Sequence, residues 1–206
     1  TGNRGGRSAY SNIVNLGLVG SPWAIDTLKA AEAAGLIPDM LKGQDMTKVI
    51  TREEFAELAL KLYQGVTGED GEPISPNPFT DTKNPQVLKA FKLEITLGTS
   101  ATTFTPKKLI TREECATMLF RTLKRVAPNE NFKVTDVKAF TDQKHIASWA
   151  LEAARYMSKI GIVAGNEKGE FMPKATTQAD IAAKFGMATR EQAIIMAYRS
   201  LEKFKK

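Results

Sequence analysis

The chain has 206 residues, of which 42% are hydrophobic and 25% are charged, so wholesale disorder and fibrous classes are excluded. Lysine and arginine number 29 against 23 aspartates and glutamates, and the net charge of +6 favours an anionic partner such as nucleic acid, anionic lipid or acidic polysaccharide. A single cysteine, Cys115, and a single histidine, His145, exclude an internal disulfide and metal sites built from several such residues.

The N-terminal part predicts a flexible lead followed by a helix. Residues 1–20 form the expected lead, and its first dozen residues are rich in Gly, Arg, Asn and Ser. Residues 21–35 predict a helix, because Ser21 can cap it, Pro22 suits its first turn and Gly35 suits its end. No stretch of the chain has the roughly 20 consecutive apolar residues that a membrane-spanning helix needs, so we expect no membrane insertion.

One motif occurs three times and predicts three further helix starts. In each copy a threonine is followed three residues later by Glu or Gln, which is the capping-box pattern, and an apolar face with helical spacing follows. The copies are Thr51-Arg52-Glu53-Glu54, Thr111-Arg112-Glu113-Glu114 and Thr189-Arg190-Glu191-Gln192.

Other landmarks recur in step with this motif and indicate three repeats. Phe79-Thr80-Asp81 matches Phe140-Thr141-Asp142, and the spacing of Gly98, Phe104 and Pro106 equals that of Gly165, Phe171 and Pro173. Trp23 precedes Gly35 by the twelve residues that separate Trp149 from Gly161. We therefore expect an all-α body of three helix-loop-helix repeats with these boundaries: repeats at 21–68, 79–127 and 140–204, linkers at 69–78 and 128–139, and an insertion in the third repeat near 175–187.

The insertion leaves the register of the third repeat open. Thr177-Gln178-Ala179-Asp180 predicts a short helix, and it also looks like a faded second copy of the capping motif. Either Thr177 or Thr189 could therefore correspond to Thr51 and Thr111.

The arginine of each motif is unexpected as a capping element. A cation at the first helical residue opposes the helix dipole, so Arg52, Arg112 and Arg190 call for a compensating group. A guanidinium beside free helix-start amides would seat a carboxylate or phosphate. Pairing with the recurring aspartates, Asp81 and Asp142, is the alternative, and the sequence leaves both open.

These motifs, in this order, resemble the S-layer homology (SLH) domain, a family that usually has three tandem repeats and anchors bacterial surface proteins. The resemblance spans roughly residues 20–204 and implies a pseudo-threefold helical bundle whose grooves bind secondary cell wall polysaccharide, often through a pyruvylated sugar. It implies that the three motif arginines meet the sugar carboxylate, with secondary groove candidates at Trp23, Trp149, Asp81, Asp142, Gly98 and Gly165.

Three departures from the family pattern stand out. The first repeat lacks the Phe-x-Asp and Phe-x-Pro segments, the second has Leu88 where a tryptophan would fall, and the third carries the insertion.

Structural interpretations compete with these roles. A tryptophan in an amphipathic helix usually packs in the core, and only an exposed ring would stack on a sugar. The glycines at 98 and 165 are expected to permit a positive φ in a turn. Four phenylalanines are expected in the core, at positions 79, 104, 140 and 171. Cys115 takes the place of Phe55 and Ala193, so we also expect it in the core rather than paired with His145 as a nucleophile.

We therefore expect a non-catalytic, extracellular module of the bacterial cell wall or S-layer. Its expected partner is an anionic cell wall polysaccharide, with no cofactor or metal, and it would be part of a larger surface protein or enzyme. The alternative is a degenerate bundle used for protein–protein assembly, in which the capping arginines are paired internally. Nucleic-acid binding is disfavoured because basic residues are dispersed except at Lys203, Lys205 and Lys206.

Overall fold

The computed structural model describes residues 17–183 and 185–205, and within them the fold is all-α, as expected. Isolated bridges between extended residues are the only β pairing in this part of the chain. The α-helices are α2 (Ile25–Ala33), α3 (Arg52–Thr67), α4 (Pro85–Lys92), α5 (Arg112–Val126), α6 (Leu151–Lys159), α7 (Gln178–Ala182) and α8 (Arg190–Phe204), and short 3₁₀ turns cover Asp39–Leu41, Gln143–His145 and Ser148–Ala150.

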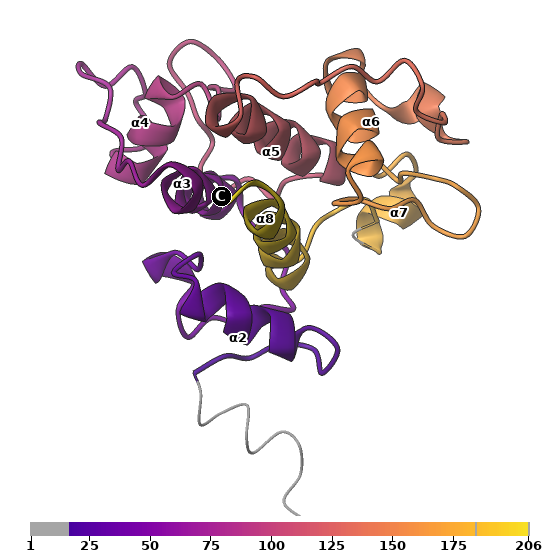
Figure 1. Cartoon of the computed structure of the whole chain (residues 1–206), viewed down its shortest axis with the longest axis horizontal. Coiled ribbons are helices and arrows are strands. Elements are labelled where there is room, and N and C mark those ends of the chain that lie inside the picture. The colour runs from indigo at the N-terminus through magenta and orange to yellow at the C-terminus, as the bar shows by residue number, and fades with distance from the viewer. Residues whose placement is uncertain (1–16, 184, 206) are drawn as a thin grey trace, which may run out of the picture.

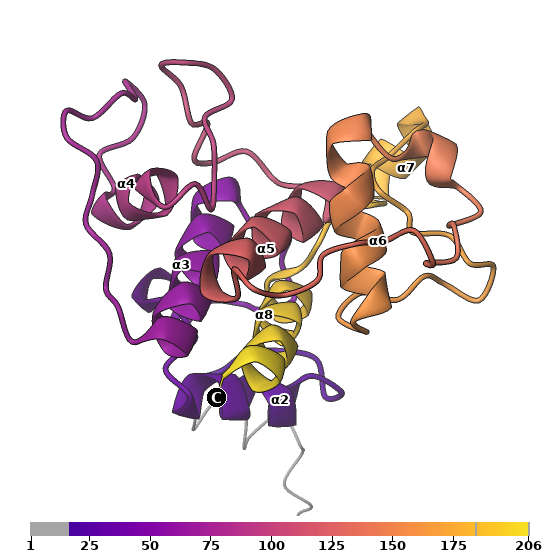
Figure 2. The same cartoon turned by 45° about the horizontal axis from the view of Figure 1, so that its top comes forward.

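Three central helices, α3, α5 and α8, pack on one another, and three outer helices, α2, α4 and α6, surround them (Figures 1 and 2). The outer helices α4 and α6 each pack on the central helix that comes before them in the sequence rather than on the one that follows. Thus α4 packs on α3, α6 packs on α5, and α2 closes the arrangement by packing on α8. The helix-loop-helix unit seen in the sequence is therefore not the packing unit.

Backbone hydrogen bonds join the starts of the central helices in a closed cycle. The amide of Arg52 donates to the carbonyl of Lys108 at 2.8 Å, and the amide of Arg112 donates to Gly186 at 2.8 Å. The amide of Arg190 donates to Lys48 at 2.8 Å, which returns the cycle to the first loop. The second helical residue of each central helix makes a parallel bond, so each helix start is held by the loop that precedes the next central helix.

The predicted capping boxes are confirmed at all three central helices. Each threonine side chain accepts the amide three residues later, and the Glu or Gln side chain accepts the amide of the threonine. The expected cap of α2 is wrong, because the helix begins at Ile25 after a turn. The backbone amide and Oγ of Ser21 instead donate to the carboxylate of Glu191 at 2.9 and 2.8 Å.

The core contains the four phenylalanines expected there. It also includes part of the predicted lead, since Leu18 is buried and the carbonyl of Val19 accepts the amide of Met46 at 2.7 Å. Residues 1–16 of that lead lie outside the described part. The predicted linker 128–139 also joins the core through Phe132, whose ring lies 4.9 Å from that of Tyr156.

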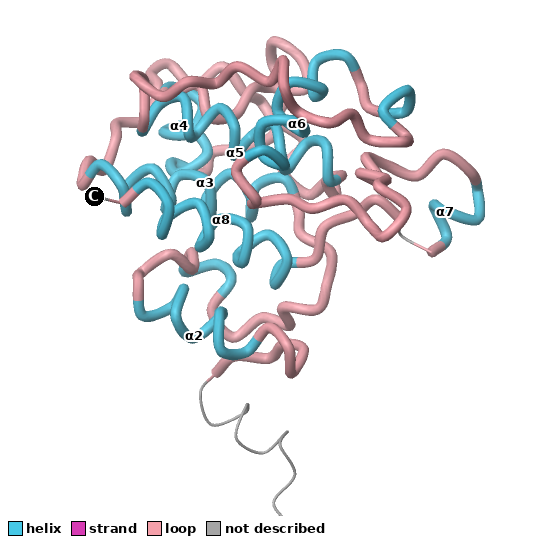
Figure 3. Tube along the Cα trace, turned by 45° about the vertical axis from the view of Figure 1, so that its right-hand side comes forward, coloured by secondary structure: helices cyan, strands magenta, loops and turns pink. Residues whose placement is uncertain are grey.

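The insertion forms the short helix α7, with the predicted capping box at Thr177 and Asp180. It lies at the periphery (Figure 3), and its Ile181 side chain is 58% exposed. Thr189, not Thr177, pairs with the first loop in the cycle of helix starts, through its bridge to Val49. This settles the register of the third motif in favour of Thr189.

No helix in the described residues is long and apolar enough to cross a membrane.

Candidate functional site

The three motif arginines occupy corresponding junctions between neighbouring helix pairs. Each side chain extends from its central helix to a backbone carbonyl of the following loop, or of the first loop in the case of Arg190. Arg52 donates to Leu97 at 2.6 Å. Arg190 donates from Nη1 to Asp45 at 3.0 Å. A guanidinium therefore lies at each of three related junctions, which we call the Arg52, Arg112 and Arg190 grooves.

Arg190 is paired with a glutamate of the first capping motif. Its Nη2 donates to Oε1 of Glu54 at 2.6 Å and its Nε donates to Oε2 at 3.2 Å. Both groups are largely buried, with side-chain exposures of 14% for Arg190 and 8% for Glu54. This bidentate geometry is the strong form of an arginine–carboxylate contact.

Arg52 is paired more loosely with Glu114 of the second capping motif. Its Nη1 lies 3.7 Å from Oε1 of Glu114, which also accepts from Lys108 at 2.8 Å. Burial by itself raises the pKa of Glu114, but the bonds from Lys108 and from the Thr111 amide, together with Arg52, leave that pKa lowered. Glu114 therefore stays ionised beside Arg52.

Arg112 shares a pocket with Gln192, which stands at the motif position of the glutamates that pair with the other two arginines. Its Nε donates to the carbonyl of Phe171 at 3.1 Å, and its Nη2 donates to that of Ala164 at 3.4 Å. Within the described ranges no carboxylate lies within ion-pairing distance of this guanidinium. Burial lowers the pKa of Arg112, and among the described residues its positive charge has no direct counter-ion.

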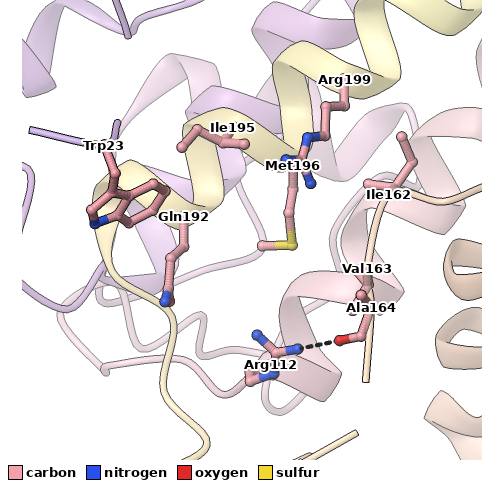
Figure 4. Close-up of a pocket in the computed structure, with 9 residues that line it drawn as sticks. All are labelled: Trp23, Arg112, Ile162, Val163, Ala164, Gln192, Ile195, Met196 and Arg199. Atoms are coloured by element: carbon pink, nitrogen blue, oxygen red, sulfur yellow. Dashed lines mark hydrogen bonds between the residues drawn. The ribbon is translucent and has the colours of Figure 1, made fainter. Parts of the chain in front are cut away.

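A pocket of about 160 Å³ opens beside Arg112 (Figure 4). It gathers residues from all three predicted repeats, with a second cation at Arg199 and an indole at Trp23. Its lining comprises Trp23, Arg112, Ile162, Val163, Ala164, Gln192, Ile195, Met196 and Arg199. We call this the Arg112 pocket.

Pockets at the other two central helices have related linings. Lys61 on α3 and Arg121 on α5 each line a pocket, and both stand nine residues after a motif arginine, as Arg199 does. Gln86 lines the pocket with Lys61. This spacing of basic residues is visible in the sequence. It was not recognised as a signal because helix surfaces often carry scattered cations.

The two tryptophans are exposed, so the interpretation of these residues as core is wrong. Trp23 is 64% exposed and Trp149 is 55% exposed. Both precede their outer helices and are held by turns rather than by a buried helix face. Trp23 lines the Arg112 pocket, which leaves its ring open to a ligand.

The two aspartates organise loops and do not pair with the motif arginines. Asp81 accepts the amides of Phe104 and Thr105 at 2.9 and 2.8 Å. Asp142 accepts those of Phe171 and Met172, each at 2.8 Å. Arg52 and Arg190 pair with glutamates instead. The alternative of internal pairing is therefore confirmed for these two arginines, but the expected aspartate partners are wrong.

The glycines at 98 and 165 do not have the positive φ that was expected. They are needed for close approach, because a Cβ on Gly98 would lie 2.3 Å from the carbonyl oxygen of Ser100 and one on Gly165 would lie 3.2 Å from that of Glu170. Positive φ occurs instead at Gly35 and Gly161, at the ends of α2 and α6.

The helix-start amides are not free for an anion, contrary to expectation. In each central helix the first two amides donate to carbonyls of a neighbouring loop and the third donates to the capping threonine. Any anion must therefore be held by side chains such as Arg112 and Arg199.

Cys115 is completely buried, as expected for a core residue, and burial raises the pKa of its thiol. His145 is exposed and lies beside a different pocket, with Asp142 and Lys174. No group of three or more potential metal-binding side chains occurs in residues 17–183 and 185–205.

A second recurring feature of the motif escaped the sequence reasoning, namely the buried glutamate after each arginine. Glu113 accepts the amide of Ala147 at 2.9 Å and Glu191 accepts that of Ser21, so each holds the start of an outer helix. The recurrence of this glutamate in the three motifs was visible, but its partners are distant in sequence.

Comparison with known proteins finds a match to the S-layer homology domain in two segments of this chain. The model of the S-layer homology domain matches residues 78–116 and 139–177. These two segments correspond to the second repeat and to most of the third up to the cap of α7, whereas residues 21–68, expected as the first repeat, lie outside both matches.

Several larger proteins are similar to the chain. An exoglucanase XynX from Acetivibrio thermocellus is 29% identical over 88% of the chain and 16% of its own length. An amylopullulanase from Thermoanaerobacterium thermosulfurigenes is 28% identical over 88% of the chain and 9% of its own length. An S-layer protein from Bacillus thuringiensis subsp. finitimus is 32% identical over 59% of the chain and 15% of its own length. The chain thus spans a small part of each.

Proposed function

We propose that this chain is a non-catalytic module that anchors a larger protein to the bacterial cell surface by binding an anionic, pyruvylated secondary cell wall polysaccharide. The observation that carries this proposal is a guanidinium at each of three related junctions, of which that of Arg112 lines a pocket with an exposed indole and has no counter-ion among the described residues. The S-layer homology matches and the similarity to small parts of surface-layer and polysaccharide-degrading proteins support the anchoring role.

The chemistry of the Arg112 pocket suits an acidic sugar. A guanidinium offers two parallel donors to a carboxylate, and a second cation, Arg199, stands across the pocket. The face of the Trp23 ring can pack on the apolar face of a sugar while the hydroxyl groups stay hydrated. A module of this kind binds and orients its ligand and needs no reacting group.

Protein–protein assembly is the second candidate, and the pairing of Arg190 with Glu54 favours it at that groove. An arginine held by an internal carboxylate has less to offer a ligand. The two candidates differ in their dependence on the glycan.

Co-sedimentation with purified wall sacculi tests the proposal. Wild-type protein is expected to sediment with sacculi that carry their polysaccharide and to stay in solution with stripped sacculi. At least one of Arg52→Ala, Arg112→Ala and Arg190→Ala should weaken binding tenfold or more, while Lys29→Ala, which removes an exposed cation of α2, should not.

Circular dichroism of each variant checks that its fold is intact. Equal binding to intact and stripped sacculi, or no binding to sacculi from several pyruvylating bacteria, would refute the glycan-binding proposal and favour a protein partner.

A further inference from the structure

The three grooves differ at the third residue of the helix that faces each arginine. Glu54 faces Arg190, Glu114 faces Arg52, and Gln192 faces Arg112. The two glutamates place a carboxylate where an acidic ligand would place its own. In two grooves a glutamate of the chain therefore competes with the ligand carboxylate for the arginine. In the third groove a neutral glutamine of similar shape takes the place of the glutamate.

In the Arg190 groove this competitor is tightly held. Both carboxylate oxygens of Glu54 bind the guanidinium fork, at 2.6 and 3.2 Å. A ligand carboxylate would have to displace Glu54 and leave its charge unpaired in a largely buried position. The exchange gains one ion pair and loses another, so this groove has little net affinity for an acid.

In the Arg52 groove the guanidinium is also hard to reach. Arg52 is only 8% exposed. Its guanidinium lies 5.0 Å from the centre of the Phe104 ring, a contact that Arg112 also makes, at 5.5 Å, with Phe171. Its Nη2 is bonded to the carbonyl of Leu97, and its remaining charge is balanced by Glu114. A ligand carboxylate would need to displace both the Leu97 carbonyl and the Glu114 carboxylate from Arg52.

Among the described residues Arg112 has only neutral hydrogen-bond partners, and its side chain lines a pocket. The carbonyl oxygens of Phe171 and Ala164 accept from it, and the Gln192 side chain extends towards the same space (Figure 4). Arg199 adds a second positive charge to the lining, and the lining contains no acidic residue.

We infer that the chain binds one acidic sugar at a time, in the Arg112 pocket, and that Gln192 is the residue that determines this choice of groove. The inference rests on the proposed function and goes further by excluding equal use of the three grooves. The ligand chemistry is a single carboxylate on a sugar ring, recognised by Arg112 and packed on Trp23.

Exchange of Gln and Glu tests this inference with little risk to the fold. Gln192→Glu should lower affinity for polysaccharide-bearing sacculi at least tenfold, because the new carboxylate would occupy Arg112. The capping bond should persist, since the side-chain oxygen of Gln192 already accepts the Thr189 amide, as the glutamates do at Thr51 and Thr111. The thermal midpoint is expected to stay equal or rise, because Arg112 gains a partner.

Glu54→Gln is the matched control, since it makes the reverse exchange at the corresponding position of another groove. Its affinity for sacculi should equal or exceed that of wild type, because loss of the Glu54 carboxylate frees Arg190 and leaves the Arg112 pocket unchanged. The two tryptophans of the chain supply a local reporter: in Trp149→Phe protein, a pyruvylated monosaccharide should change the fluorescence of Trp23, and the neutral sugar should not.

Unchanged sacculus binding by Gln192→Glu, or a larger loss in Glu54→Gln, would overturn the inference while leaving glycan anchoring intact. A pyruvylated monosaccharide that changes the fluorescence of Trp149 in Trp23→Phe protein, and not that of Trp23, would also overturn it. Failure of wild type to bind polysaccharide-bearing sacculi would overturn the proposed function itself, and the inference with it.

Discussion

Single carboxylates shape the loops that carry the grooves. The side chain of Asp81 accepts two consecutive amides, of Phe104 and Thr105, and Thr105 has a φ of 55°. A non-glycine residue in this region is strained, so the two charge-assisted bonds stabilise a turn that Thr105 would otherwise avoid. Asp142 does the same for Met172, whose φ is 56°.

Replacing Asp81 should therefore change the dependence of stability on pH. The bond from the Phe104 amide, followed by that from Thr105, lowers the pKa of Asp81 below its ordinary value. Its stabilising effect is then present above the unfolded pKa of about 3.9 and is lost as pH falls through the lower folded value.

We expect Asp81→Asn to be less stable than wild type to urea at pH 6 and to converge with it near pH 2. Glu72→Gln, an exposed change on a loop, serves as the control. A stability difference that is constant from pH 6 to pH 2 would contradict an ionised Asp81 as the source of the effect.

At the scale of an element, close backbone approach matters as much as helix propensity. The loop after α4 folds back so that Gly98 faces the carbonyl oxygens of Ser100 and Thr103 and the ring of Phe79. The end of α2 makes a different demand, since Gly35 has a φ of 70° but open space where its Cβ would be. Gly98 thus meets a steric need and Gly35 a conformational one.

Alanine substitutions should separate these two needs. Gly35→Ala is expected to cost about 1 kcal/mol in the free energy of unfolding, the usual penalty for a left-handed residue. Gly98→Ala should cost more, about 3 kcal/mol or above, because its Cβ would lie 2.3 Å from backbone that cannot move alone. Urea unfolding followed by circular dichroism measures both, and equal costs would argue against the steric role.

At the scale of the whole molecule, the chain closes on itself. The outer helix α2 packs on α8, the last central helix, and the buried Glu191 accepts both polar hydrogens of Ser21. Each outer helix packs on a central helix that belongs to another repeat. The two helices of one repeat therefore cannot bury their apolar faces on each other alone. The described part of the chain should unfold as one unit.

Glu191→Ala tests this closure. It removes the acceptor of a partly buried backbone amide and hydroxyl, which costs about 1–3 kcal/mol and lowers the midpoint of a single thermal transition by several degrees. Glu202→Ala, an exposed change on the same helix, should leave the midpoint nearly unchanged. A separate early transition in Glu191→Ala would show that α2 detaches alone and that the body is not cooperative.

Local signals in the sequence determined much of the fold. The three central helix starts, the α7 cap, the phenylalanine core and the burial of Cys115 were all predicted, because capping boxes and apolar spacing depend on residues close together in the chain. The motif arginines were also identified as the residues that carry charge at the candidate site.

Only the tertiary structure decided which groups those arginines meet. The pairing of each outer helix with the preceding central helix, the bond from Ser21 to Glu191 and the use of the helix-start amides by loop carbonyls all join residues far apart in sequence. The same holds for Arg112, whose lack of a carboxylate follows from Gln192, 80 positions away, being its neighbour across the groove. The local sequence pattern determines where a helix starts. The electrostatic environment of a side chain depends on every group that packs against it, and only long-range packing brings those groups together.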